Sequence, residues 1–113
     1  MEEEQSYCAL LQKGWASSPE LASMDSVLKA IGEMKDIGES PEKFRVDFLD
    51  EGEQLALEVH SDLRFVVRLR LSKQIHGKAK NWLEVEVLCR LFLKRRFEEL
   101  TKRIENYPVQ QSI

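Results

Sequence analysis

The most restrictive feature of this sequence is a change in its hydrophobic period near residue 41. Before that point, apolar residues recur at spacings of three and four: Leu21, Met24, Val27, Leu28, Ile31 and Met34. After it, apolar and polar residues alternate in three runs, at 44–48, 54–60 and 64–71. A period of 3.6 is typical of an amphipathic helix, and a period of two is typical of a half-buried strand. The chain is therefore expected to combine helix and sheet.

The boundaries of the first main helix follow from its flanking residues. Ser18 can cap a helix N-terminus, and Pro19 suits the first helical position because its missing N–H would have no partner there. Gly38 can adopt a left-handed C-cap. These signals predict a helix over 19–36. Residues 7–15, which end near Gly14, are expected to form a short additional helix.

The three alternating runs predict an antiparallel meander, because only short turns at 50–53 and 61–62 separate them. One face of such a sheet would be apolar and covered, and the other polar and exposed to water. Residues 72–80 are expected to be a loop that is broken at Gly77.

Residues 82–106 contain no Gly or Pro and are predicted to form one long helix that ends before Pro108. Asn81 can cap it, and Glu84, three residues later, completes a capping box. A strand at 82–88 is the alternative, because 83–87 also alternates, but residues 88–93 offer no turn after it. The expected fold class is α+β, with a two-layer αβββα arrangement of a three-stranded antiparallel meander packed against both helices.

A chain of 113 residues has room for one core. We expect an acidic, partly flexible segment at 1–17, one domain at 18–107 and a short tail at 108–113. The start, Met-Glu-Glu-Glu, is the reverse of a secretory signal, and no window is long and apolar enough to span a membrane. Two cysteines are too few for a disulfide scaffold. We therefore expect a cytoplasmic or nuclear location and no membrane contact.

The segment 82–93 is apolar on nearly all sides of a helical wheel, with Leu83, Val87 and Leu91 opposite the main apolar face. Either the sheet and the first helix bury both sides, or a partner chain does. The second interpretation predicts a non-catalytic protein-interaction subunit or adaptor, forming a homo- or heterodimer through this helix and a sheet edge. Its expected partner-binding residues are Leu83, Val87, Leu91, Phe92 and Phe97.

Charge is unevenly distributed, with −9 in residues 1–60 and +6 in residues 61–113. Arg64, Arg68 and Arg70 share one strand face, and the next predicted helix carries Lys94, Arg95 and Arg96. Guanidinium groups bind phosphates well, so an RNA-binding subunit is the alternative function. The competing interpretation is that nearby carboxylates neutralise both basic sets.

No motif for catalysis, metal binding or nucleotide binding is present. His60 and His76 have no second ligand at metal-binding spacing, and Cys8 and Cys89 are typical of buried small apolar residues. We therefore expect no enzyme activity, no catalytic residue, no metal, no cofactor and no small-molecule substrate.

At the level of element order alone, the predicted αβββα arrangement resembles the small signal-recognition-particle subunits that bind Alu RNA. It is also loosely similar to RWD-type domains of kinetochore and ubiquitin-pathway complexes. The first resemblance implies RNA binding and the second implies protein binding. The acidic first half of the chain departs from the former, and the RWD pattern needs a fourth strand.

Overall fold

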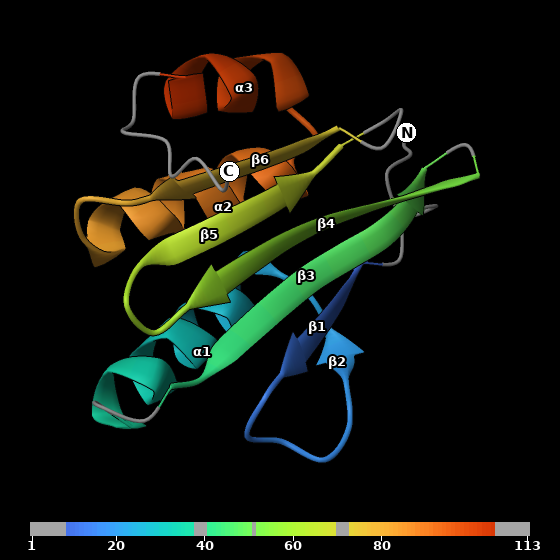
Figure 1. Ribbon diagram of the computed structural model, residues 1–113. Helices are drawn as coiled ribbons and strands as arrows, with labels where there is room; N and C mark the ends of the chain where they lie inside the picture. Colours follow the sequence, from blue (N-terminus) through green and yellow to red (C-terminus); the bar gives the residue numbers. More distant parts are fainter. Residues whose placement is uncertain (1–8, 38–40, 51, 70–72, 106–113) are drawn as a thin grey trace.

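The computed structural model describes residues 9–37, 41–50, 52–69 and 73–105. Within these residues the chain forms a six-stranded antiparallel sheet and three helices (Figure 1). In chain order the elements are β1 (Leu10–Lys13), β2 (Glu20–Leu21), α1 (Met24–Ile37), β3 (Lys43–Asp50), β4 (Glu53–His60), β5 (Arg64–Arg68), β6 (Gln74–Lys78), α2 (Trp82–Leu93) and α3 (Phe97–Glu105). The strand order is β2-β1-β3-β4-β5-β6. The fold is α+β, as predicted, but the sheet has six strands instead of three.

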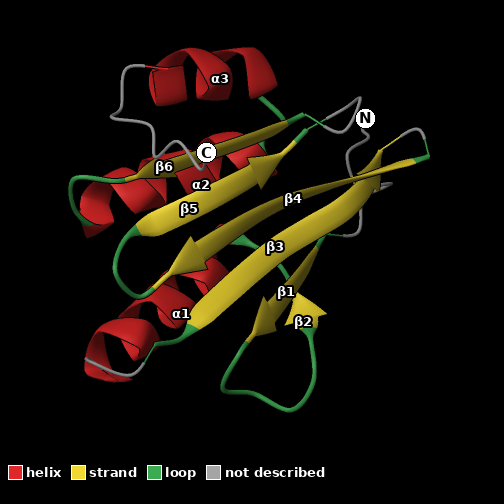
Figure 2. Ribbon diagram, in the orientation of Figure 1, coloured by secondary structure: helices red, strands yellow, loops and turns green. Residues whose placement is uncertain are grey.

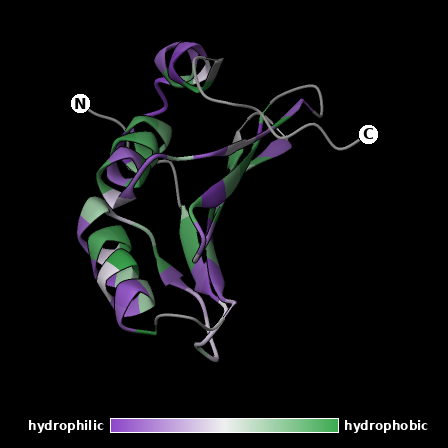
Figure 3. Ribbon diagram, turned by 60° about the vertical axis from the view of Figure 1, so that its left-hand side comes forward, coloured by the Kyte–Doolittle hydropathy of each residue, from purple (hydrophilic) through white to green (hydrophobic). Residues whose placement is uncertain are grey.

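Helices α1 and α2 lie on the same side of the sheet, and α3 packs against α2 (Figures 2 and 3). No described helix covers the opposite face. The core lies between these layers and is built from alternate strand residues that point toward the helices. Its strand members are Leu11, Phe44, Val46, Phe48, Leu55, Leu57, Val59, Phe65 and Val67. Helical core residues include Val27, Ile31, Val85, Leu88, Phe92, Leu100 and Ile104.

The predicted meander is present as β3, β4 and β5. Its register places Val46 opposite Leu57, and Leu57 opposite Val67, so one apolar row crosses all three strands. A shift by one residue would turn each of these rows toward water, so burial fixes the register.

The helix expected at 7–15 is not formed in the part of that segment that the structure describes, because Leu10–Lys13 form strand β1 instead. Leu11 is buried opposite Val46, while Leu10 lies on the other face with a partly exposed side chain. The backbone groups along the edge of β3 find partners in β1, and this tertiary pairing decides between helix and strand. Gly14 does not end a helix: its N–H donates to the carbonyl of Lys43 at 2.9 Å. The sheet thus begins before residue 18, where the domain was expected to start.

Helix α1 begins at Met24, five residues later than predicted from Pro19. The cap is Ser23, whose hydroxyl accepts from the Ser26 N–H at 3.1 Å, while the Ser26 hydroxyl accepts from the Ser23 N–H at 2.8 Å. This reciprocal pair is a Ser–Ser version of a capping box. The expected C-cap, Gly38, lies outside the described residues.

The loop expected at 72–80 contains strand β6, which pairs with β5. Gly77 does not interrupt the strand. It lies directly opposite Phe65, whose ring occupies the space above it, so that a Cβ at Gly77 would be 2.6 Å from Phe65 Cζ. A glycine allows this close approach of an aromatic ring.

The single helix expected at 82–106 is two helices, with a break at 94–96. Arg95 has a φ of 61°, the N–H of Arg96 donates to the Leu91 carbonyl, and that of Arg95 donates to the Phe92 carbonyl. These bonds form a Schellman motif, which normally has glycine in the left-handed position. The start of α2 is as predicted: the Asn81 side chain accepts from the Glu84 N–H at 2.9 Å. The strand alternative at 82–88 is therefore excluded, and the element order differs from the αβββα arrangement on which both resemblances rested.

Candidate functional site

The predicted partner-binding residues fall in different environments. Leu83 is 68% exposed at the start of α2, and Val87 and Leu91 are half-buried. Phe92 is fully buried and belongs to the core of the chain itself. Because α1 and α3 both pack against α2, they cover much of the helix surface that the sequence suggested would be free. The exposed apolar surface of α2 is therefore concentrated at its first turn.

Phe97 belongs to an aromatic cluster beneath the break between α2 and α3. Its ring centroid is 6.2 Å from that of Phe48 and 5.9 Å from that of Phe92. Arg95 extends over the Phe48 ring at 5.1 Å, an attractive cation–π geometry. These contacts fold α3 back onto α2, so the half-buried Phe97 stabilises this turn.

The arginines of the sheet face already have nearby polar partners. Arg64 Nε donates to the Asp62 carboxylate at 2.8 Å, and Arg45 Nε donates to Asp47 at 3.0 Å. Arg68 donates to the side-chain oxygen of Gln74 at 2.8 Å, in the amide orientation that satisfies both groups. Arg70 lies outside the described residues. The open face thus carries both signs of charge.

The second basic set does not join the first. Arg95 reaches the ring of Phe48, a core residue on the helix side of the sheet, whereas Arg68 lies on the open side. Arg96 pairs with Glu99 at 2.6 Å, and Lys94 is the exposed C-cap of α2. The structure does not combine these groups with Arg64 and Arg68 into one basic patch.

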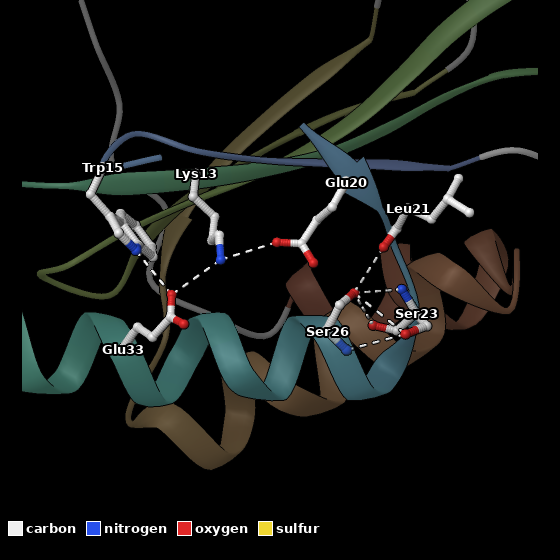
Figure 4. A network of polar contacts seen from close by, with 7 residues as sticks. All are labelled: Lys13, Trp15, Glu20, Leu21, Ser23, Ser26 and Glu33. Atoms are coloured by element: carbon white, nitrogen blue, oxygen red, sulfur yellow. Dashed lines mark hydrogen bonds and ion pairs between the residues drawn. The ribbon is translucent and has the colours of Figure 1, made fainter. Parts of the chain in front are cut away.

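A titratable network that the sequence did not reveal connects the β1–β2 hairpin to α1 (Figure 4). The Lys13 ammonium lies 3.0 Å from the Glu20 carboxylate and 3.2 Å from Glu33, and Trp15 Nε1 donates to Glu33 at 3.0 Å. The bond to Glu20 raises the pKa of Lys13, and the bonds from Trp15 and Lys13 lower the pKa of Glu33. Every charge in the network has a partner, so its role is to hold the hairpin on the helix.

Cys89, His60 and the acidic side chains bear on whether the described residues could support nucleophilic or metal chemistry. Cys89 is fully buried, and burial raises the pKa of its thiol to about 12, so it is not a nucleophile near neutral pH. His60 lies 2.8 Å from a Glu58 oxygen, which is also 3.7 Å from the Lys43 ammonium. Among these residues, no group of three or more His, Cys, Asp or Glu could hold a metal ion. Nor does any helix there have the length and apolar character needed to cross a membrane.

Two hollows on the sheet are lined by charged side chains of both signs. One, of about 670 Å³, lies where β3 begins and β4 turns into β5, and it is lined by Gly14, Pro41, Glu42, Lys43, His60, Ser61, Asp62 and Arg64. A smaller one, about 100 Å³, is lined by Arg45, Gln54, Ala56, Glu58, Val66, Arg68 and Gln74. Binding pockets for small molecules are usually enclosed and apolar. These two hollows are open to solvent and are lined by charged side chains of both signs, so they do not have that character.

The sequence predicts a contact through a sheet edge but does not reveal the strand that forms the open edge, β6, which no described strand extends. Two backbone hydrogen bonds show which of its residues face β5. The Leu69 N–H donates to the Lys73 carbonyl, and the Ala79 N–H donates to the Leu63 carbonyl. Hydrogen-bonded and non-hydrogen-bonded pairs alternate in an antiparallel ladder. Gln74, His76 and Lys78 therefore direct their backbone N–H and C=O groups outward.

The open edge and the exposed start of α2 are close in the chain, because only three residues separate Lys78 from Trp82. We call Gln74–Lys78 together with Leu83 the β6–α2 surface. It offers main-chain hydrogen bonds and, five residues after Lys78 in the chain, an exposed leucine, a combination that strand addition uses. Comparison with protein-family models, with curated proteins and with solved structures finds no match to this chain, so the geometry alone supports a function.

Proposed function

We propose that the chain is a non-catalytic protein-interaction subunit that assembles with a second protein chain through the β6–α2 surface. The observation that carries this proposal is the open β6 edge, with three residues whose backbone groups face away from β5. A strand in this position provides ready hydrogen bonds to a strand of another chain. Such an assembly would act in the cytoplasm or the nucleus.

The exposed side chain of Leu83 adds an apolar contribution beside the edge. Full burial of a leucine side chain is worth about 1.5–3 kcal/mol. Since Leu83 is 68% exposed, covering it in a complex recovers roughly two thirds of that, about 1–2 kcal/mol. This is a useful anchor but too little for a stable complex, so the edge has to supply the remaining contacts.

The RNA-binding alternative has weaker support from the described residues. Asp62 and Asp47 bind Arg64 and Arg45, and Glu58 lies between Lys43 at 3.7 Å and His60 at 2.8 Å on the same face. An RNA backbone would have to compete with these carboxylates for each guanidinium. The prediction for Arg64, Arg68 and Arg70 can be tested by RNA binding that weakens steeply with salt.

The proposal is tested by purifying the tagged chain from extract of its own cells, after nuclease treatment, and measuring the stoichiometry of whatever remains bound. The matched variants are Leu83→Glu, on the β6–α2 surface, and Leu49→Glu, on β3. Both leucines are 68% exposed, so neither change disturbs the core.

We expect a stoichiometric partner, or a second copy, with the wild-type chain and with Leu49→Glu, and its loss with Leu83→Glu. Far-ultraviolet circular dichroism of both variants checks that each remains folded. Equal losses in the two variants, or a wild-type chain that remains alone at every concentration, would contradict the proposal.

A further inference from the structure

The two edges of the sheet differ in length and in charge. The β2 edge is the two-residue strand Glu20–Leu21, whereas β6 has five residues. The stretch 63–83, which contains β5, β6 and the start of α2, has six basic residues and no acidic one: Arg64, Arg68, Arg70, Lys73, Lys78 and Lys80. The longer edge is therefore also the strongly basic one.

Resting on the proposed function, we propose that β6 binds an extended acidic segment of a partner protein, which adds to the sheet as a seventh strand. Three lysines along the edge carry charge that no described group neutralises. Lys73, Lys78 and Lys80 are exposed, and none of them forms an ion pair with another described residue. Arg68 binds only the neutral amide of Gln74 among these residues, so its charge is also uncompensated.

The sign of this charge selects the occupant. Lysines at an edge oppose pairing with a second copy of the same edge, since like charges would then face one another. The same lysines attract a strand with carboxylates. The edge therefore favours a partner of different sequence over a second β6.

The backbone favours a peptide over a nucleic acid. The outward positions of Gln74, His76 and Lys78 alternate N–H donors with C=O acceptors. A peptide strand satisfies both kinds of group, because each of its residues has one donor and one acceptor. The phosphates of a nucleic acid only accept hydrogen bonds, so its backbone does not match this regular alternation of donors and acceptors as a peptide strand does.

The sheet also specifies the pattern of the occupant. On the open face, the side chains of Gln74, His76 and Lys78 lie in the rows of Arg68, Val66 and Arg64. On the helix side, Ile75 is partly buried against the core. Because side chains of an added strand alternate between faces, the preferred segment carries Asp or Glu at every second position and apolar residues between them.

The probe is a fluorescein-labelled peptide of about ten residues that alternates Glu and Val, long enough for an ordinary strand. Binding to the full chain is measured by fluorescence anisotropy at low and high salt. The reference peptides are an alternating Lys–Val peptide and a Glu–Val peptide of the same composition whose glutamates are clustered at one end. We expect binding of the alternating acidic peptide alone, weakening as salt rises.

The central variant is His76→Pro. It removes an outward N–H but no bond to β5, and proline is tolerated on the free side of an edge strand. We expect it to weaken peptide binding about tenfold or more, since a donor is lost and the ring blocks close approach. His76→Ala keeps the backbone donor and should bind like the wild-type chain. Lys78→Glu with Lys80→Glu should abolish binding without touching the core.

A second readout does not depend on any variant. On peptide addition, the amide protons of Gln74, His76 and Lys78 should become protected from hydrogen exchange, while those of Ile75 and Gly77, which face β5, change little. Protection elsewhere, or equal affinity for all three peptides, would overturn the inference. So would tighter binding of polyuridine RNA that His76→Pro leaves unchanged.

The two proposals fail separately. If a cellular partner is lost with Leu83→Glu but no acidic peptide protects the β6 amides, the interaction subunit stands and the acidic strand does not. If no partner is found while the peptide binds as described, the edge chemistry is correct and the proposed assembly is not.

Discussion

Replacing Gly77 by alanine tests the most tightly packed backbone position on the β6 edge. A Cβ there would lie 2.6 Å from Phe65 Cζ and 3.1 and 3.2 Å from its two Cε atoms, where ordinary contacts are 3.4–4 Å. Phe65 is buried, so its ring has little room to retreat. Overpacking of this kind costs about 1–3 kcal/mol.

Part of that cost is offset, because alanine reduces the entropy of the unfolded chain by about 0.4–1 kcal/mol. We therefore expect Gly77→Ala to lower the free energy of unfolding by about 1–2 kcal/mol. The matched control is Gly32→Ala in α1, where nothing lies within 4 Å of the new Cβ. In an open helical position the same substitution should stabilise by about 0.5–1 kcal/mol.

The assay is urea unfolding followed by far-ultraviolet circular dichroism and tryptophan fluorescence. Phe65→Leu removes the three ring atoms that the new methyl group would meet. Phe65→Leu should therefore lower the free energy of unfolding less in the Gly77→Ala background than in the wild-type chain, with a coupling energy of about 1 kcal/mol. A Gly77→Ala chain as stable as the wild type, or changes at Gly77 and Phe65 that simply add, would refute the close ring–glycine contact.

Three further predictions concern single side chains. In a Cys8→Ser chain, Cys89 should resist a thiol reagent at about pH 8, because a pKa of about 12 leaves about one thiol in ten thousand ionised. In denaturant the same thiol should react fully. Rapid labelling of the folded chain would show that this thiol is accessible. The pKa of Glu33 is lowered because Trp15 and Lys13 donate to its carboxylate. Ionised Glu33 therefore stabilises the folded chain above the ordinary pKa of 4.5, and this contribution is lost as pH falls through the lower pKa of the folded state. Glu33→Gln should therefore flatten the loss of stability on acidification, measured as the urea midpoint across pH, and an unchanged slope would argue against the bonds. Asn81→Ala should cost about 1 kcal/mol in urea unfolding through loss of the α2 cap, whereas Asn81→Ser should be nearly neutral.

Strong periodic patterns in the sequence were sufficient to predict part of this fold. The alternation in 44–71 predicts the antiparallel meander, and burial of one face fixes its register. Asn81 followed by Glu84 predicts the start of α2. In these segments local propensity and tertiary packing favour the same structure, so reading the pattern is enough.

The missed elements share a different physical origin. β6 has one large apolar residue, Ile75, so its sequence shows no alternation. It is a strand because its backbone pairs with the edge of β5, and Gly77 leaves room there for the Phe65 ring. The break after α2 could not be predicted from Gly or Pro, because neither residue is present there. Arg95 takes the left-handed position instead and lies over the Phe48 ring. β1 has four residues, too few for its pattern to distinguish strand from helix.

Periodicity and charge are properties of the chain, so the α+β class, the apolar face of the meander and the concentration of basic residues in 63–83 follow from the sequence alone. That β6 ends the sheet among the described residues, and that Phe92 is core while Leu83 is exposed, follows only from how the chain packs. The reason is that an edge and a covered helix face are defined by their neighbours. β6 can be identified as an edge strand only in the folded chain, where no other described strand pairs with its outward backbone groups.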